Sequence, residues 1–181
     1  MSVYVHLADG FEEVEALCAV DVLRRGGVEV KTVAMTDSKR VCGAHGIFVE
    51  ADILFSEADY GQCDMIVLPG GMPGAVNLQR HEGLTAQIAA FAQEGKWLAA
   101  ICAAPMVYGE MGLLSGRRAV CYPGMEKHLA GAIPVGDPVV VDGNFITGKG
   151  PGFAAEFALT LLSVLAGKDQ AAEVRSGMLL D

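Results

Sequence analysis

The segment WLAAICAAPMVYGEMG, residues 97–112, places a cysteine between two different patterns. The apolar run Trp97–Ile101 predicts a buried strand, and the segment from Ala103 onward predicts a helix. A thiolate is a nucleophile, and a helix N-terminus lowers the pKa of a nearby thiol through its dipole and free N–H groups. The alanines and the proline that follow Cys102 suit a tight turn into a helix. Cys102 is therefore either a nucleophile on a strand-to-helix elbow or a buried structural thiol.

Three glutamates open a predicted helix near the N-terminus, in the segment GFEEVEAL. Acidic residues in the first turn complement the helix dipole, and this accounts for Glu12 and Glu13. Glu15 lies one turn inside the helix, between apolar neighbours. A buried carboxyl beside other carboxylates resists ionisation. Glu15 is therefore either a further dipole partner or a protonated acid that donates a hydrogen bond to a thiolate.

Glycine-rich loops follow two other predicted strands. Gly70 and Gly71 permit unusual backbone angles and a close approach of N–H groups to a ligand. Three interpretations of these glycines are open: an oxyanion hole beside Cys102, a plain turn, or a phosphate-binding loop. The absence of G-x-G-x-x-G and G-K-[ST] weakens the phosphate interpretation. The segment GKGPG, 148–152, is either a loop leading into a helix or part of a site.

The four histidines offer no obvious base for a cysteine nucleophile. His6 lies in the first predicted strand, His81 lies between helical stretches, and His128 lies in the polar segment MEKHLAG. These are expected to be structural or solvated. The same holds for His45 in GAHG, although its loop could bring it to the edge of the site.

Composition limits the kinds of partner. The chain has 181 residues and a net charge of −9, which argues against binding to nucleic acid or to anionic membranes. No apolar run approaches the roughly 20 residues of a membrane span, and the N-terminus does not resemble a signal peptide. Five cysteines without a C-x-x-C motif argue against disulfides and a zinc site. We expect a cytoplasmic protein with reduced thiols, and no metal or other cofactor.

Alternating strands and helices predict one α/β domain over residues 1–181, with a mostly parallel sheet between helices. Ligands bind at the carboxyl ends of parallel strands, where the acidic turn, both glycine-rich loops and Cys102 would meet. The predicted strands are 3–8, 28–35, 64–71, 97–101, 117–122 and the hairpin 138–143 with 144–150, and 41–52 holds two extended pieces. The predicted helices are 10–27, 82–94, a segment after Cys102, 152–167 and 168–177.

Four segments together resemble the ThiJ/PfpI superfamily, in the branch of the Parkinson's disease protein DJ-1 and its bacterial relatives. They are FEEVEALCAVDVLRRGG, DMIVLPGGMPGA, AAICAAP and GKGPGFAAEFALTLLSVLAGKDQAAEV. The resemblance implies a flavodoxin-like three-layer sandwich and a homodimer. It also implies a nucleophile at Cys102, a protonated Glu15, and oxyanion donors at the backbone N–H groups of Gly71 and Ala103.

The sequence departs from this family at three positions. Tyr122 stands where the animal branch has a histidine near the cysteine, and His45 stands where the family has an arginine in its anion pocket. Ala103 replaces the histidine of the protease-like branch, which argues against peptidase activity. Gly70, His45, Tyr122 and Pro151 are the expected substrate-binding residues.

The resemblance implies glyoxalase or deglycase chemistry on small α-oxoaldehydes such as methylglyoxal, in a stress-response protein. Cys102 would form a hemithioacetal with the aldehyde, and Glu15 would transfer protons. The alternative is a non-enzymatic sensor of oxidants or a redox-regulated chaperone, in which oxidation of Cys102 changes the state of the protein. A role in thiazole phosphate metabolism finds no phosphate motif in this sequence.

Overall fold

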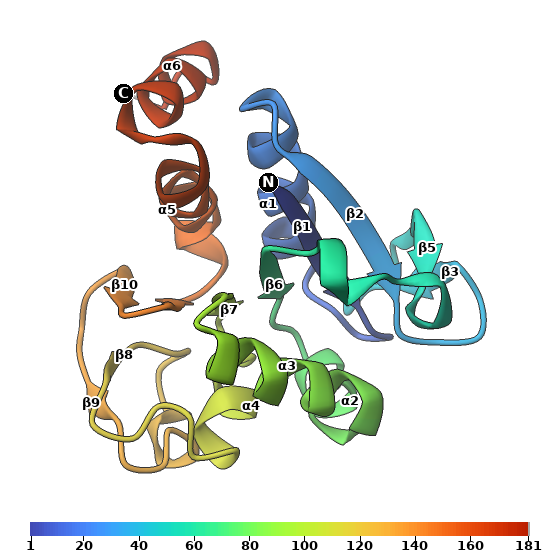
Figure 1. The fold of residues 1–181 in the computed structure, drawn as a ribbon, viewed down its shortest axis with the longest axis vertical. Coiled ribbons are helices and arrows are strands. Elements are labelled where there is room, and N and C mark those ends of the chain that lie inside the picture. Colours follow the sequence, from blue (N-terminus) through green and yellow to red (C-terminus); the bar gives the residue numbers. More distant parts are fainter. Residues whose placement is uncertain (181) are drawn as a thin grey trace.

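A seven-stranded sheet forms the centre of the computed structural model, which describes residues 1–180 (Figure 1). Its strand order is β10-β11-β7-β6-β1-β2-β5, and only the β10–β11 pair is antiparallel. The strands are β1 (Ser2–Leu7), β2 (Glu29–Ala34), β5 (Ile53–Leu54), β6 (Met65–Leu68), β7 (Trp97–Ile101), β10 (Val139–Asp142) and β11 (Phe145–Gly148). All six residues of β1 and all four of β6 are buried, as expected for parallel strands covered on both faces.

The helices are α1 (Glu13–Arg25), α2 (Gly74–Arg80), α3 (Glu82–Glu94), α4 (Pro105–Glu110), α5 (Ala154–Ala166) and α6 (Lys168–Gly177). The chain passes from β1 through α1 to one side of the sheet, and from β6 through α2 and α3 to the other. Right-handed crossovers in opposite directions place α1 and α3 on opposite faces. In Figure 1, α5 and α6 stand with α1, while α2, α3 and α4 form a separate group. The predicted flavodoxin-like sandwich is confirmed.

Helix α1 shows why the sequence folds in this way locally. Its acidic residues lie in the first turn and Arg24 and Arg25 in the last, as the helix dipole favours. Ala16, Ala19 and Leu23 recur at helical spacing and are fully buried. This apolar face packs against the core and α5, so that the N-terminal end of α1 is fixed at the carboxyl edge of the sheet.

Three predictions of secondary structure need correction. Residues 74–80 form helix α2, which a glycine- and proline-rich segment did not suggest. Within 117–122 only Arg118–Ala119 is a strand, β8, and it pairs with β9 (Ile133–Pro134) outside the main sheet. In the predicted hairpin 138–150, the sequence favours a turn at Asp142-Gly143, but Asp142 pairs with Phe145 and the turn is therefore Gly143-Asn144. The extended pieces within 41–52 do form a hairpin, β3 (Arg40–Cys42) with β4 (Phe48–Glu50).

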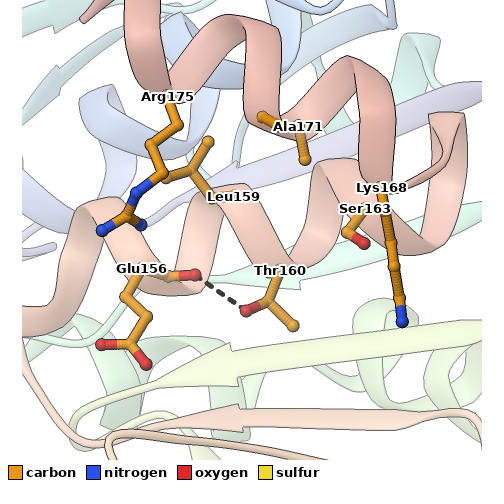
Figure 2. A pocket seen from close by; sticks show the side chains of 8 residues that line it. Glu156, Leu159, Thr160, Ser163, Lys168, Ala171 and Arg175 are labelled. Carbon is orange, nitrogen blue, oxygen red and sulfur yellow. Dashed lines mark hydrogen bonds between the residues drawn. The ribbon is translucent and has the colours of Figure 1, made fainter. Parts of the chain in front are cut away.

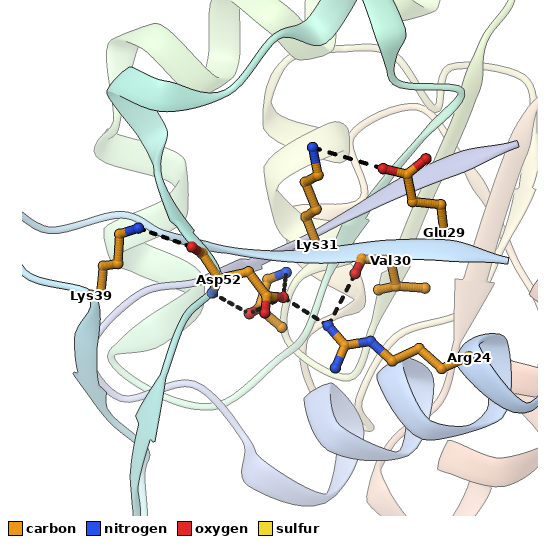
Figure 3. Close-up of polar contacts among 7 residues, drawn as sticks. Arg24, Glu29, Val30, Lys31, Lys39 and Asp52 are labelled. Carbon is orange, nitrogen blue, oxygen red and sulfur yellow. Dashed lines mark hydrogen bonds and ion pairs between the residues drawn. The ribbon is translucent and has the colours of Figure 1, made fainter.

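A polar cluster around Asp52 ties α1 to the edge of the sheet (Figure 3). Its Oδ2 accepts hydrogen bonds from the Arg24 guanidinium at 2.8 Å and from the backbone N–H of Thr32 at 2.8 Å. Arg24 also donates to the Val30 carbonyl at 3.0 Å, and Lys39 donates to the Asp52 carbonyl at 3.0 Å. These bonds hold the end of α1, strand β2 and the approach to β5 in one arrangement. Among the described residues, no helix has the length and apolar character needed to cross a membrane.

Candidate functional site

Cys102 occupies a strained elbow between β7 and α4. Its φ is +64°, in the left-handed region that residues other than glycine rarely adopt. Two backbone hydrogen bonds hold this conformation: Cys102 N–H donates to the Gly148 carbonyl at 2.9 Å, and Tyr122 N–H donates to the Cys102 carbonyl at 2.8 Å. Strain of this kind persists only where surrounding structure imposes it, and it is frequent at functional sites. The elbow therefore has the backbone geometry expected of a positioned nucleophile.

Glu15 reaches this elbow from the first turn of α1. It is 1% exposed, and its Oε2 accepts a hydrogen bond from the Gly70 backbone N–H at 2.8 Å. Its Oε1 is buried and accepts no hydrogen bond from an N–H or O–H group within residues 1–180. Burial raises the pKa of Glu15 to about 7, against its bond to Gly70. A proton on Oε1 would make this buried oxygen a donor, and the side chain of Glu15 shares a hydrogen bond with Cys102.

The Cys102 thiol is less acidic than a helix N-terminus alone would make it. Burial, followed by the charge of Glu15 and a hydrogen bond with it, raises the pKa of Cys102 to about 12. The backbone N–H groups of Gly71 and Ala103 lie close enough to the sulfur to act in the opposite direction. Burial therefore affects the pKa of Cys102 more than the nearby N–H groups do, because the residue is only 8% exposed and its thiol lies against the Glu15 carboxyl. Thiol and carboxyl form a coupled pair that carries one proton between its two titrations.

Glycine is required at two positions beside this pair. A Cβ at Gly70 would lie 2.6 Å from the Cys102 Cβ and 2.8 Å from the Glu15 Oε2, closer than real contacts allow. Gly71 has a φ of +87° and its Cα faces the backbone of Gly10 and Glu12. The PGG segment is thus a close backbone approach that brings the Gly70 N–H to Glu15 and the Gly71 N–H to the Cys102 sulfur, and it is more than a simple turn.

His45 interacts with the helix start and not with the thiol. Its Nδ1 lies 2.8 Å from the Glu13 Oε2 and 3.5 Å from the Glu12 Oε2. Glu13 lies in the first turn of α1, as the dipole interpretation requires, but its carboxylate is also buried and accepts the His45 backbone N–H at 2.7 Å. A Cβ at position 43 would overlap this carboxylate, so the glycine at this position is the sequence feature that is consistent with a buried Glu13.

The side chains of Glu12, Glu13 and His45 place one ligand atom each within 4.8 Å of one another, so this group could hold a metal ion. The oxygens of Glu13 already accept hydrogen bonds from His45 and, more weakly, from the Ile47 N–H. These bonds explain the cluster as an anchor for the β3–β4 hairpin on α1.

Tyr122 and Pro151 lie at the periphery. Tyr122 bonds to the elbow through its backbone, and its side chain is 49% exposed with the ring beside Gly150. Pro151 is exposed and begins the short 3₁₀ helix before α5. Within residues 1–180, no hydrogen bond or ion pair joins the side chains of His45 or Tyr122 to Cys102. The structure thus brings together Cys102, Glu15 and the backbone of Gly70, Gly71 and Ala103, and leaves the other candidates outside this group.

The remaining histidines have structural partners, as the sequence predicted. His6 is buried and lies 2.7 Å from the Tyr60 hydroxyl. The Nδ1 of His81 accepts the Leu84 N–H at 3.0 Å and caps α3, and His128 lies 2.6 Å from a Glu110 oxygen.

A groove of about 370 Å³ between α5 and α6 lies apart from these residues (Figure 2). Figure 2 shows Arg175 and Lys168 toward opposite ends of it. The Thr160 hydroxyl donates to the Glu156 backbone carbonyl at 2.8 Å, so that its proton is already used within the helix. No residue of the Cys102 site lines this groove.

Fold and site together define a flavodoxin-like α/β protein with a buried cysteine on a strained strand-to-helix elbow. Residues 1–164 match the model described as the DJ-1/PfpI family, and the chain belongs to this family. It is 39% identical over 180 residues to protein DJ-1 homolog B of Arabidopsis thaliana, covering 98% of this chain but 41% of that protein. The chain thus spans less than half the length of this plant relative.

Two further relatives are similar over most of their length. A protein named deglycase from Pyrococcus abyssi is 37% identical over 155 residues, which are 84% of this chain and 92% of that one. The structure of oxidised Toxoplasma gondii DJ-1 superimposes with a TM-score of 0.94 at 38% identity, covering 98% of this chain and 97% of that one. The resemblance inferred from the sequence motifs is confirmed.

Proposed function

We propose that the chain converts small α-oxoaldehydes such as methylglyoxal, with Cys102 as the nucleophile and Glu15 as the proton donor and acceptor. One observation carries this proposal. Cys102 is held at φ +64° opposite a nearly inaccessible carboxyl whose Oε1 has no other partner. A buried acid with a pKa of about 7 can both give and take a proton near neutral pH. The deglycase name of the Pyrococcus relative supports this class of substrate.

The chemistry begins with the proton that the pair shares. With that proton on Glu15, the Cys102 sulfur is a thiolate stabilised by the N–H groups of Gly71 and Ala103. The sulfur attacks the aldehyde carbon, the carbonyl electron pair moves to oxygen, and Glu15 supplies the proton that completes the hemithioacetal. Glu15, now a carboxylate, removes the C1 hydrogen as a proton, which leaves an enediolate over C1 and C2. Glu15 returns this proton to C2 and the C1 hydroxyl proton moves to the C2 oxygen, so that C1 becomes the carbonyl of a thioester with Cys102. Water then hydrolyses the thioester and releases lactate and the free thiol.

The proposal also covers the domain, the cellular location and the assembly state in which the activity takes place. A single ThiJ/PfpI-type domain over residues 1–181 acts in the cytoplasm, in the response to stress, without a metal or another cofactor. Gly70 shapes the site, and His45, Tyr122 and Pro151 border the path of the substrate. Peptidase activity is not part of the proposal, because Ala103 provides no imidazole next to the nucleophile. The working form is a homodimer, and a monomeric mass by light scattering at micromolar concentration would contradict that.

The test is conversion of methylglyoxal to lactate by the purified protein. Cys102→Ser should abolish lactate formation, because the hydroxyl is a far weaker nucleophile than the thiolate. Cys121→Ser is the matched control, since Cys121 is also buried and lies in the adjoining segment. A wild-type rate equal to that of buffer, or equal losses in both variants, would refute the proposed enzyme.

A second candidate function is that of an oxidation sensor or a redox-regulated chaperone. The specific observation in its favour is the ring of donors around the sulfur. The N–H groups of Gly71 and Ala103, with the proton on Glu15, could each hydrogen-bond to a sulfinate oxygen on Cys102. The Toxoplasma relative is described as oxidised, which supports this chemistry. A peroxide-dependent change in chaperone activity or in assembly, lost in Cys102→Ser, would favour this function if methylglyoxal is not converted.

A further inference from the structure

A pocket of about 300 Å³ opens at the same edge of the sheet as Cys102, but over different strands. Ala8 and Asp9 follow β1, and Met35 and Thr36 follow β2, so that the pocket lies at the carboxyl ends of two parallel strands. Open α/β sheets bind ligands at this edge. The remaining wall consists of Asn77, Arg80 and His81, at and just after helix α2. No residue of the Cys102 site lines the pocket.

Two residues of the pocket offer hydrogen-bond acceptors. The Asp9 Oδ1 accepts the Cys42 backbone N–H at 3.0 Å, which fixes the carboxylate and leaves its Oδ2 available. The Asn77 amide group donates from Nδ2 to the Asp9 backbone carbonyl at 2.8 Å. This bond leaves the Asn77 Oδ1 as a second acceptor. A carboxylate and an amide oxygen, both oriented by other bonds, form a suitable site for an ammonium group.

Two further residues of the pocket offer donors. Arg80 ends α2, is exposed, and makes no ion pair or side-chain hydrogen bond within residues 1–180. The His81 Nδ1 accepts the Leu84 N–H at 3.0 Å, so the proton of a neutral ring is on Nε2. The ring packs against Phe55 with centroids 4.4 Å apart, which limits its rotation. A guanidinium and an imidazole N–H form a suitable site for a carboxylate.

Opposite charges thus line one pocket without joining each other. No ion pair within 4.0 Å links Asp9 to Arg80 in the described part of the chain, although this is the simplest way to neutralise both. A ligand with a single charge would pair with either Asp9 or Arg80 and would leave the other residue without a partner of opposite charge. Thr36 adds no further donor, because its hydroxyl donates to the Ser38 carbonyl at 2.8 Å.

We propose that this pocket binds the zwitterionic group of a free α-amino acid. The ammonium lies against Asp9 and the Asn77 Oδ1, and the carboxylate lies against Arg80 and the His81 Nε2–H. The Met35 and Ala8 side of the pocket accommodates a small side chain. This site is separate from the proposed aldehyde chemistry and does not depend on it.

The test uses glycine and L-alanine as probes in an amide-NMR titration of the full chain. Both should shift the amide signals of residues 8–9, 35–36 and 77–81 in a saturable way. Acetate and methylammonium, each with one charge, should bind at least tenfold more weakly, because each loses the charge-assisted bonds on one side. Arg80→Gln and Asp9→Asn should each weaken glycine binding by about tenfold or more.

Glu82→Gln is the matched control, since it removes one exposed charge next to the pocket without lining it. Its glycine affinity should equal that of the wild type. The same spectra report whether each variant is folded. Absence of saturable shifts with glycine, acetate binding as tight as glycine binding, or equal weakening by Glu82→Gln and Arg80→Gln would each overturn the proposal. Cys102→Ser should leave glycine binding unchanged, so the outcome is independent of the aldehyde reaction.

Discussion

Replacing Glu15 distinguishes a carboxyl that donates a hydrogen bond to Cys102 from one that only lies nearby. Glu15→Gln keeps an acceptor for the Gly70 N–H and offers an amide N–H to the sulfur, with which the Glu15 carboxyl shares a hydrogen bond. Glu15→Leu has similar bulk and neither group. Both variants remove the negative charge that contributes to the raised pKa of Cys102. For the thiolate, the two variants therefore differ only in whether residue 15 can donate a hydrogen bond to the sulfur.

The size of the difference follows from the energy of that hydrogen bond. A hydrogen bond to a charged group contributes about 1.5–3 kcal/mol. One pKa unit corresponds to about 1.4 kcal/mol, so the Cys102 thiol in Glu15→Leu should titrate roughly 1–2 units above that in Glu15→Gln. In the wild type the pair should release its first proton near pH 7, because burial raises the pKa of Glu15 to about 7. This loss produces the singly charged pair, in which Glu15 and the sulfur share the remaining proton, so alkylation through the thiolate form should rise near neutral pH.

The assay is the rate of alkylation by iodoacetamide at the peptide that contains Cys102, measured by mass spectrometry across a range of pH. Thermal unfolding of each variant checks that it is folded, since Glu15→Leu leaves the Gly70 N–H without its acceptor. Equal pH midpoints in Glu15→Gln and Glu15→Leu would show that this position donates no hydrogen bond to the sulfur. The proposed proton transfer by Glu15 would then lose its structural basis.

Further predictions concern the packing, acid stability and oxidation of the chain. Gly70→Ala should lower stability by about 1–3 kcal/mol and slow alkylation of Cys102, because the added Cβ would lie 2.6 Å from the Cys102 Cβ; Gly177→Ala, with open space around it, is the control for both readouts. His6 has its pKa lowered to about 4 by burial, so the unfolded chain binds the extra proton more readily between pH 6.5 and 4. Stability should fall by up to about 1.4 kcal/mol per pH unit as pH decreases through this window, and urea unfolding of His6→Gln should show a smaller decrease. An equal decrease in both proteins would contradict this role of His6. Graded peroxide should add two oxygens to Cys102 before it oxidises Cys42; peptide mass spectrometry that finds Cys42 oxidised first, or Cys102 in a disulfide, would disprove this order.

Much of the site was predictable because its chemistry depends on short segments of sequence. Trp97–Ile101 reads as a buried strand, and the small residues after Cys102 indicate a sharp turn into a helix. The paired glycines after β6 indicate an unusual backbone, and the structure gives Gly71 a φ of +87°. The rule that parallel strands place their carboxyl ends at one edge then brings these loops together with Glu15.

Helix α2 and the position of β8 were not predictable from local pattern. Residues 74–80 begin with glycine directly after the glycine- and proline-rich loop, and a segment of seven residues is too short to show a clear helical period. They are helical because Ala75 and Leu78 are buried against the core. Arg118–Ala119 has the apolar and branched neighbours of a sheet strand. It pairs with β9 instead, because β11 already occupies the position beside β7.

The sequence by itself determined the fold class, the elbow cysteine and the acidic partner on α1, since each follows from hydrophobic period, from residue size or from the family motifs. Only the tertiary structure decided the protonation chemistry. The sequence suggested that a helix N-terminus would make the Cys102 thiol acidic, but burial and a facing carboxyl raise its pKa to about 12 and couple it to Glu15. Likewise, Glu13 has the sequence position of a solvent-exposed dipole partner, but the β3–β4 hairpin covers it and turns it into a buried anchor for His45. Desolvation depends on which segments pack over a charged group, and those segments come from distant parts of the chain.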